Sequence, residues 1–122
     1  MALPARIPKK AKRATRWTSS RHRTFVASFA CCKCGSVKSI EAAHVRIGSD
    51  AGMGQKPDDW RVVSLCFACH RGPTAAAQHT QGERSFWAGV DYDRLIAEFI
   101  QASPVKLEIL TAQSERALGV AA

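Results

Sequence analysis

The chain has 122 residues, 46% of them hydrophobic, and a formal net charge of +8. This length predicts one domain with a modest core, and no apolar run approaches the roughly 18 residues that a membrane span needs. The start of the chain is basic and lacks the apolar segment of a secretory signal, so neither a membrane protein nor a secreted disulfide scaffold is expected. We expect a cytoplasmic protein whose five cysteines are reduced and available to a metal.

The positive charge is concentrated at the start of the chain. Residues 1–40 hold ten lysines and arginines and no acid (+10), whereas residues 41–122 hold eight and ten (−2). A basic arm on a near-neutral body is typical of nucleic-acid binding, because its cations release the counterions condensed on phosphates. A solvated tail, or a targeting signal in residues 8–13, would explain the arm alone. The candidate nucleic-acid contacts are Lys9, Lys10, Lys12, Arg13, Arg16, Arg21 and Arg23.

Residues 1–17, basic and interrupted by prolines, are expected to be disordered without a partner. A helix is predicted to begin at the capping residue Ser20 and to bury an apolar stripe. A strand over residues 39–47 and a second strand over residues 61–65 are then expected to pair as a hairpin. The glycine-rich residues 48–57 would be its connection.

Three helices are predicted in the rest of the chain. A short one covers residues 74–79, follows Pro73 and ends before Gly82. Asp91 caps the next, which runs through Ile100 with apolar residues at helical spacing. The last begins at residues 103–104 and ends near residue 119.

Two Cys-x-x-Cys pairs carry the clearest chemical signal. Cys31 and Cys34 form the first, and Cys66 and Cys69 form the second. Four thiolates in two such pairs fit a tetrahedral structural zinc with S–Zn distances of about 2.3 Å. Cys32 falls outside the spacing. The alternative is a set of reduced buried thiols or a redox pair.

Three histidines are candidates for further chemistry. His44 lies on the predicted first strand beside small alanines, with Arg46 on the same face. A neutral imidazole can take a proton from water, and a guanidinium can hold a phosphate with two hydrogen bonds. His70 and His79 could hold a second divalent ion. The alternatives are a structural His44, a redundant His70 beside the zinc and a solvated His79, while His22 is interpreted as part of the basic surface.

With these motifs in order, the chain resembles the HNH endonucleases, and within them the small phage and prophage group that includes the RecA-dependent nuclease and lambdoid recombination nucleases. The resemblance covers about residues 18–102. The matching stretches are 25–35, 41–46, 56–66, Cys69-His70 and 79–91. It implies an α+β fold with a ββα-metal, treble-clef-like core. The arm 1–17 and a C-terminal helix expected over residues 103–122 lie outside the resemblance.

The resemblance also implies roles for individual residues. His44 would be the general base that activates water, and Asp59 would orient it. His70 and His79 would hold a catalytic Mg²⁺, Mn²⁺, Ni²⁺ or Zn²⁺, and Arg46 would clamp a nonbridging phosphate oxygen. The expected function is hydrolysis of DNA in phage or prophage recombination or DNA processing, in a bacterial or phage-infected cell and with a recombinase as a possible partner. A non-catalytic, zinc-stapled DNA-binding or recombination accessory module stays open.

Overall fold

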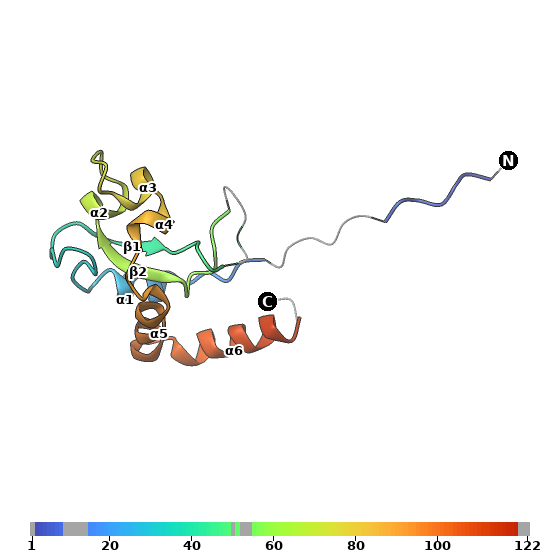
Figure 1. Ribbon diagram of the computed structural model, residues 1–122. Helices are drawn as coiled ribbons and strands as arrows, with labels where there is room; N and C mark the ends of the chain where they lie inside the picture. Colours follow the sequence, from blue (N-terminus) through green and yellow to red (C-terminus); the bar gives the residue numbers. More distant parts are fainter. Residues whose placement is uncertain (1, 9–14, 50, 52–54, 120–122) are drawn as a thin grey trace.

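In the computed structural model the described residues are 2–8, 15–49, 51 and 55–119. Four of the predicted nucleic-acid contacts lie outside them, namely Lys9, Lys10, Lys12 and Arg13. The described residues form a small α+β fold with a two-stranded antiparallel sheet (Figure 1). In chain order the elements are α1 (Ser20–Val26), β1 (Ile40–His44), β2 (Val62–Cys66), α2 (Phe67–Arg71), α3 (Gln78–Gln81), α4 (Glu83–Phe86), α5 (Tyr92–Ala102) and α6 (Lys106–Ala117).

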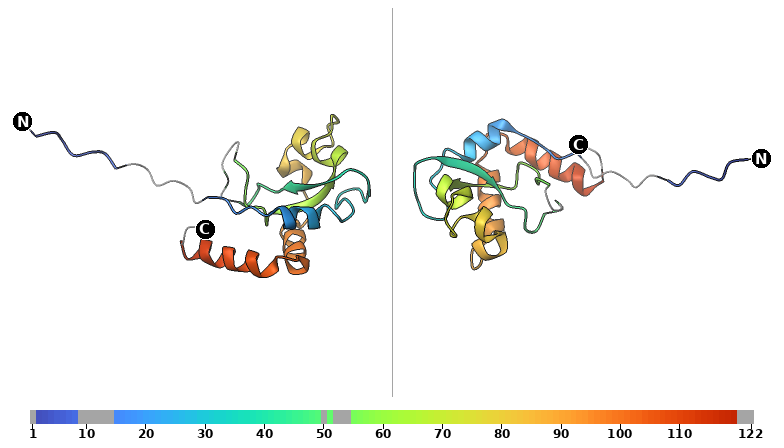
Figure 2. Two further views of the ribbon diagram at one scale, coloured as in Figure 1. Left: turned by 180° about the vertical axis from the view of Figure 1, so that it is seen from behind. Right: turned by 90° about the horizontal axis from the view of Figure 1, so that it is seen from above.

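The predicted hairpin is confirmed. β1 pairs antiparallel with β2, with Ile40 opposite Cys66 and His44 opposite Val62. All five residues of β2 are buried, because helices cover the hairpin from both sides: α2, with α3 and α4 beside it, on one, and α1 and α5 on the other (Figures 1 and 2). The apolar residues of β2 therefore lie at the centre of the core, and the one polar residue of the strand, Ser64, is buried with them.

β1 is shorter than the predicted strand 39–47, and Arg46 lies beyond its end. The carboxylate of Glu83 accepts the backbone N–H groups of Arg46 (2.8 Å) and Ile47 (2.8 Å). The Glu83 side chain on α4 thus takes up the backbone donors directly beyond the end of β1, and strand pairing does not continue past His44.

Helix α1 begins as predicted, but Ser19 and not Ser20 is its cap: the Ser19 hydroxyl accepts from the backbone N–H of His22 (3.1 Å).

The interpretation of His22 as basic surface is wrong. Its side chain is fully buried, with Nδ1 2.9 Å from the hydroxyl of Ser103. Burial lowers the pKa of His22, so that the imidazole is neutral in the folded protein.

The segment between β2 and α5 consists of three short helices, α2, α3 and α4. The predicted helix 74–79 is displaced: residues 74–77 form a turn and α3 begins at Gln78. Gly82 ends α3 as predicted, and its positive φ of 87° turns the chain directly into α4, which was not predicted from the sequence. Helices of four or five residues are too short to display a hydrophobic period, so spacing alone does not reveal them.

The two long helices match the prediction closely. Asp91 caps α5 by accepting from the N–H of Arg94 (3.0 Å), and α5 buries three apolar residues against the core. Helix α6 begins at Lys106, slightly later than predicted. Its Arg116 forms two hydrogen bonds to the buried Asp58 (2.9 and 3.0 Å), which fastens α6 to the loop before β2.

The segment before α1 is joined to the body from residue 15 onward, although residues 1–17 were predicted to be a disordered arm. Arg116 donates to the carbonyl of Thr15 (3.1 Å), and the segment passes the end of α6 in Figure 2. The indole of Trp17 lies 5.7 Å from that of Trp60. Residues 2–8 are exposed and have no regular structure. No helix among the described residues is long and apolar enough to cross a bilayer.

Candidate metal centre and cleft

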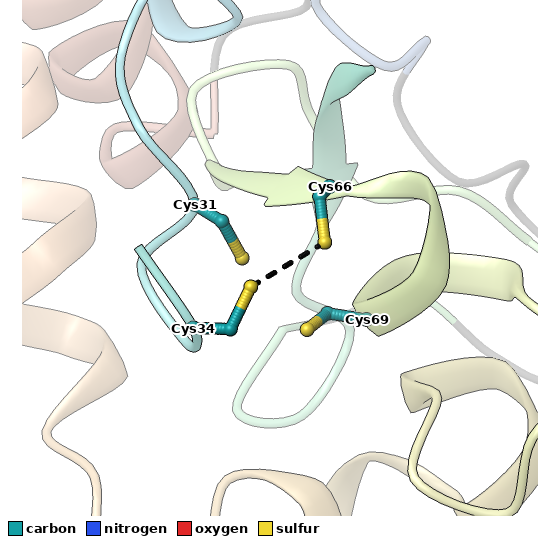
Figure 3. A group of neighbouring side chains, drawn as sticks. All are labelled: Cys31, Cys34, Cys66 and Cys69. Carbon is teal, nitrogen blue, oxygen red and sulfur yellow. Dashed lines mark hydrogen bonds between the residues drawn. The ribbon is translucent and has the colours of Figure 1, made fainter. Parts of the chain in front are cut away.

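Four cysteines from two parts of the chain converge at one end of the hairpin (Figure 3). Cys31 and Cys34 lie in the loop after α1, Cys66 ends β2, and Cys69 lies in α2. Their sulfur atoms all lie within 4.8 Å of one another, and those of Cys34 and Cys66 are 3.6 Å apart. A zinc tetrahedron with bonds of about 2.3 Å has sulfur–sulfur edges of about 3.8 Å. The four cysteines are thus placed to bind a metal ion such as zinc.

The loop that carries the first pair is shaped by backbone hydrogen bonds. Gly35, with φ of +78°, allows its own N–H to reach the carbonyl of Cys31 (2.9 Å). The N–H of Cys32 donates to the carbonyl of Ser64 on β2 (2.8 Å), which holds the loop beside the second pair. The Cys32 side chain is exposed, outside the cluster and 3.3 Å from the Ser64 hydroxyl. It is therefore not a member of the ligand set, as predicted.

The pKa values of the cysteine thiols also favour a bound cation. Burial raises the pKa of Cys31, but hydrogen bonds from backbone N–H groups, that of Cys66 foremost, outweigh it and lower the pKa to about 6. Burial and the neighbouring sulfurs raise the pKa of Cys69 far above its usual range. Without a metal, therefore, the four thiols do not all ionise at neutral pH, and a divalent cation would remove that conflict.

A second group of residues is organised around Asp59. His44, at the end of β1, has its Nε2 2.8 Å from Oδ1 of Asp59, whose side chain is fully buried. A carboxylate can only accept, so Nε2 carries the proton and Nδ1 of the neutral ring carries the lone pair. Burial raises the pKa of Asp59, but the hydrogen bonds from His44 and the Ser19 backbone, with the nearby charges, lower it to about 2. Asp59 is therefore ionised and holds the imidazole in one tautomer.

Two arginines complete the surroundings of Asp59. Arg16 donates to Oδ1 (2.8 Å), and Nε of Arg23 lies 3.2 Å from Oδ2. Both were predicted as nucleic-acid contacts, and the structure pairs both with this carboxylate. Arg21, the third predicted contact within the described residues near α1, is exposed. The buried negative charge is thus compensated by three cationic or donating side chains.

His70 and His79 lie together although a glycine and a proline separate them in sequence. Their ring centroids are 4.5 Å apart at 74°. Gly72 explains the return of the chain: a Cβ there would lie 2.9 Å from the Cα and carbonyl oxygen of Ala68 in α2. Because Gly72 has no side chain, the chain folds back onto α2 and α3 presents His79 beside His70. The carboxylate of Glu41, which was not among the residues predicted from the sequence, lies 2.9 Å from Nδ1 of His70.

A cleft of about 1000 Å³ joins these groups. His44, His70 and His79 all line it. Five cationic side chains line it as well, namely Arg23, Arg46, Lys56, Arg71 and Arg84. The carboxylate that lines it, that of Glu83, is occupied by backbone N–H groups. Among the described residues that line the cleft there is no phenylalanine, tyrosine or tryptophan, so its chemistry suits a phosphate backbone and not the faces of bases.

Comparisons with protein-family models, with curated proteins and with solved structures gave no match. The resemblance of the motifs to the HNH endonucleases therefore stays a prediction.

Proposed function

We propose that the chain is a metal-dependent endonuclease of the HNH type that hydrolyses phosphodiester bonds of DNA. The observation that carries the proposal is the cleft, in which His44, oriented by a buried carboxylate, shares one space with a histidine pair and five cations. A proton acceptor, a site for a divalent ion and positive charge are what hydrolysis of a phosphodiester requires.

The order of the elements supports the finer fold assignment. A hairpin is followed at once by a helix, and the second cysteine pair lies where β2 passes into α2. This agrees with the ββα-metal, treble-clef-like core that the sequence resemblance implies, with zinc as a structural ion. In the proposed protein the zinc cluster fixes the hairpin whose first strand ends in His44.

In the proposed reaction, Nδ1 of His44 takes a proton from a water molecule as the water oxygen attacks phosphorus. Asp59 stays ionised, keeps the ring in the required tautomer and stabilises the imidazolium that forms. As the bond from phosphorus to the 3′ oxygen breaks, the leaving oxygen takes a proton from solvent water, and the products carry a 3′-hydroxyl and a 5′-phosphate. Arg46, whose side chain lines the cleft, would bind a nonbridging oxygen.

His70 and His79 are the residues that would hold the catalytic ion. Two imidazoles suit Mn²⁺, Ni²⁺ or Zn²⁺ and, with water ligands, Mg²⁺. When bound, the ion would supply electrostatic stabilisation of the charge that develops on the phosphate. Asp or His often precedes the base in the HNH family, whereas this chain has Ala43, so the two histidines would be the principal ligands.

The basic arm is expected to supply affinity that does not depend on sequence. Deleting residues 2–14 removes five cations, and we expect weaker DNA binding with a shallower salt dependence. The slope of log K against log salt should fall by about 0.9 for each phosphate that the arm no longer neutralises. The measurement is a binding titration over a range of salt concentrations, with a shuffled arm of the same charge as the matched control. A deletion that leaves the slope unchanged would contradict this role.

Cleavage of circular DNA tests the proposed function. Zinc-loaded protein is incubated with supercoiled plasmid, and separately with a single-stranded circle, in Mg²⁺, Mn²⁺, Ni²⁺ or EDTA. We expect breaks that require the divalent ion and leave ends that ligase can seal. Intact DNA under every ion, from protein that still binds DNA, would favour the alternative, a non-catalytic DNA-binding or recombination accessory module, with or without a recombinase partner.

A further inference from the structure

Glu41 connects the first strand to the histidine pair. It lies in β1, three residues before His44, and its Oε1 is 2.9 Å from Nδ1 of His70. Its other oxygen accepts from Nη2 of Arg71 (2.6 Å). The side chain of Glu41 is 27% exposed and that of His70 is 14% exposed, so the contact is largely shielded from solvent.

The chemistry of this contact fixes the tautomer of His70. An ionised carboxylate can only accept, so the neutral ring must carry its proton on Nδ1 and its lone pair on Nε2. Arg71 keeps the carboxylate in place with hydrogen bonds from Nε (3.0 Å) and Nη2 (2.6 Å). A histidine with one nitrogen held by a carboxylate and the other free to donate a lone pair is the arrangement that orients metal ligands.

The position of the second ring favours the same interpretation. The ring of His79 stands at 74° to that of His70, with 4.5 Å between centroids, and both rings line the cleft. A purely structural link between β1 and α2 needs only the Arg71–Glu41 ion pair. The additional hydrogen bond to His70 orients a ring that already lies beside a second potential ligand.

We propose that Glu41 is a positioning residue for a divalent-ion site formed by His70 and His79, through its hydrogen bond to Nδ1 of His70. This inference rests on the proposed function, because it concerns the ion that the nuclease would use. Glu41 itself touches neither the ion nor DNA. It sets the tautomer and ring angle with which His70 meets the ion, and it increases the basicity of that ligand.

The test measures binding of Mn²⁺ to the full-length, zinc-loaded protein by calorimetry. Glu41→Gln keeps the size of the side chain but removes its charge, and its amide group can donate a hydrogen bond as well as accept one. We expect affinity for Mn²⁺ to fall about 10- to 100-fold, and His79→Ala to remove the site. Glu98→Gln is the matched control, because it also neutralises a glutamate paired with an arginine but lies on the exposed side of α5. Its affinity should equal that of the wild type.

A second measurement reports the tautomer of His70 directly and needs no bound ion. In ¹⁵N NMR spectra of the wild-type protein without Mn²⁺, His70 should be in the Nδ1–H tautomer, and Glu41→Gln should show a mixture of tautomers. An Nε2–H tautomer in the wild type, no binding of Mn²⁺, or a Glu41→Gln affinity equal to that of the wild type would each overturn the proposal. If Mn²⁺ binding follows the expectation but DNA stays intact, the positioning role stands and the nuclease proposal fails.

Discussion

Cys69→Ser is expected to unfold the domain. A structural zinc bound by four thiolates contributes an apparent free energy of about 10–16 kcal/mol at neutral pH, comparable with the whole stability of about 5–15 kcal/mol of a typical domain. Cys69 is only partly buried, so the loss of packing with serine is small and the result reports on the ligand. Thermal melts by far-ultraviolet circular dichroism, with zinc content measured on the same samples, provide the test.

Cys32→Ser is the control for this experiment. Cys32 lies one residue from Cys31 but outside the four-sulfur cluster, so zinc content and melting temperature should stay at the wild-type values. Chelation of zinc from the wild type should reproduce the effect of Cys69→Ser. A cooperative melt of Cys69→Ser within a few degrees of the wild type would show that the cluster does not hold the fold together.

Asp59→Asn is expected to reduce both stability and cleavage. The buried carboxylate pairs with Arg16, Arg23 and His44, and breaking such a buried charge arrangement costs about 3–5 kcal/mol. The amide of the new asparagine can also turn its NH₂ group toward His44, so that it no longer holds the imidazole in the tautomer with the lone pair on Nδ1. General-base catalysis is worth about 100-fold or more, so cleavage should fall by at least that factor. Chemical unfolding and plasmid cleavage measure the two effects separately.

The pH dependence of this effect has a definite sign. The pKa of Asp59 is about 2 in the folded protein against 3.8 for the ordinary side chain. The stabilisation is therefore complete well above pH 3.8 and is lost only as the pH falls toward 2; its pH-dependent part is about 2 kcal/mol. The difference in unfolding free energy between wild type and Asp59→Asn should therefore shrink as the pH falls from 3.8 toward 2. A difference that stays constant over this acid range would contradict the assignment.

The hairpin, the cysteine cluster and the long helix α5 could be predicted from the sequence because their signals are local. Apolar runs bounded by turns, a Cys-x-x-Cys spacing and a capping Asp91 each lie within a few residues of the structure that they specify. The contacts of Glu41 with His70, of Glu83 with the end of β1 and of Arg116 with Asp58 could not be predicted. Each joins residues 29 to 58 positions apart, and only the tertiary fold makes them neighbours.

The position of His22 was missed for a related reason. Between two arginines it has the appearance of basic surface, but α1 turns its side chain inward to Ser103, the residue that directly follows α5. The adjacent acids Asp58 and Asp59 did carry a usable signal. They are the one pair of adjacent acids in the sequence, they come just before an apolar strand, and the structure buries both.

The most direct test of the proposed function compares wild type with His44→Ala in the cleavage of supercoiled plasmid in Mn²⁺. Removing the proton acceptor should slow cleavage by about 100- to 10,000-fold. His44→Ala also removes one of the three groups that compensate the buried Asp59, so its melting temperature should fall, whereas DNA binding and zinc content should stay near the wild-type values. Added imidazole should restore part of the rate. Cleavage by His44→Ala at the wild-type rate, or no cleavage by zinc-loaded wild type, would contradict the proposed function.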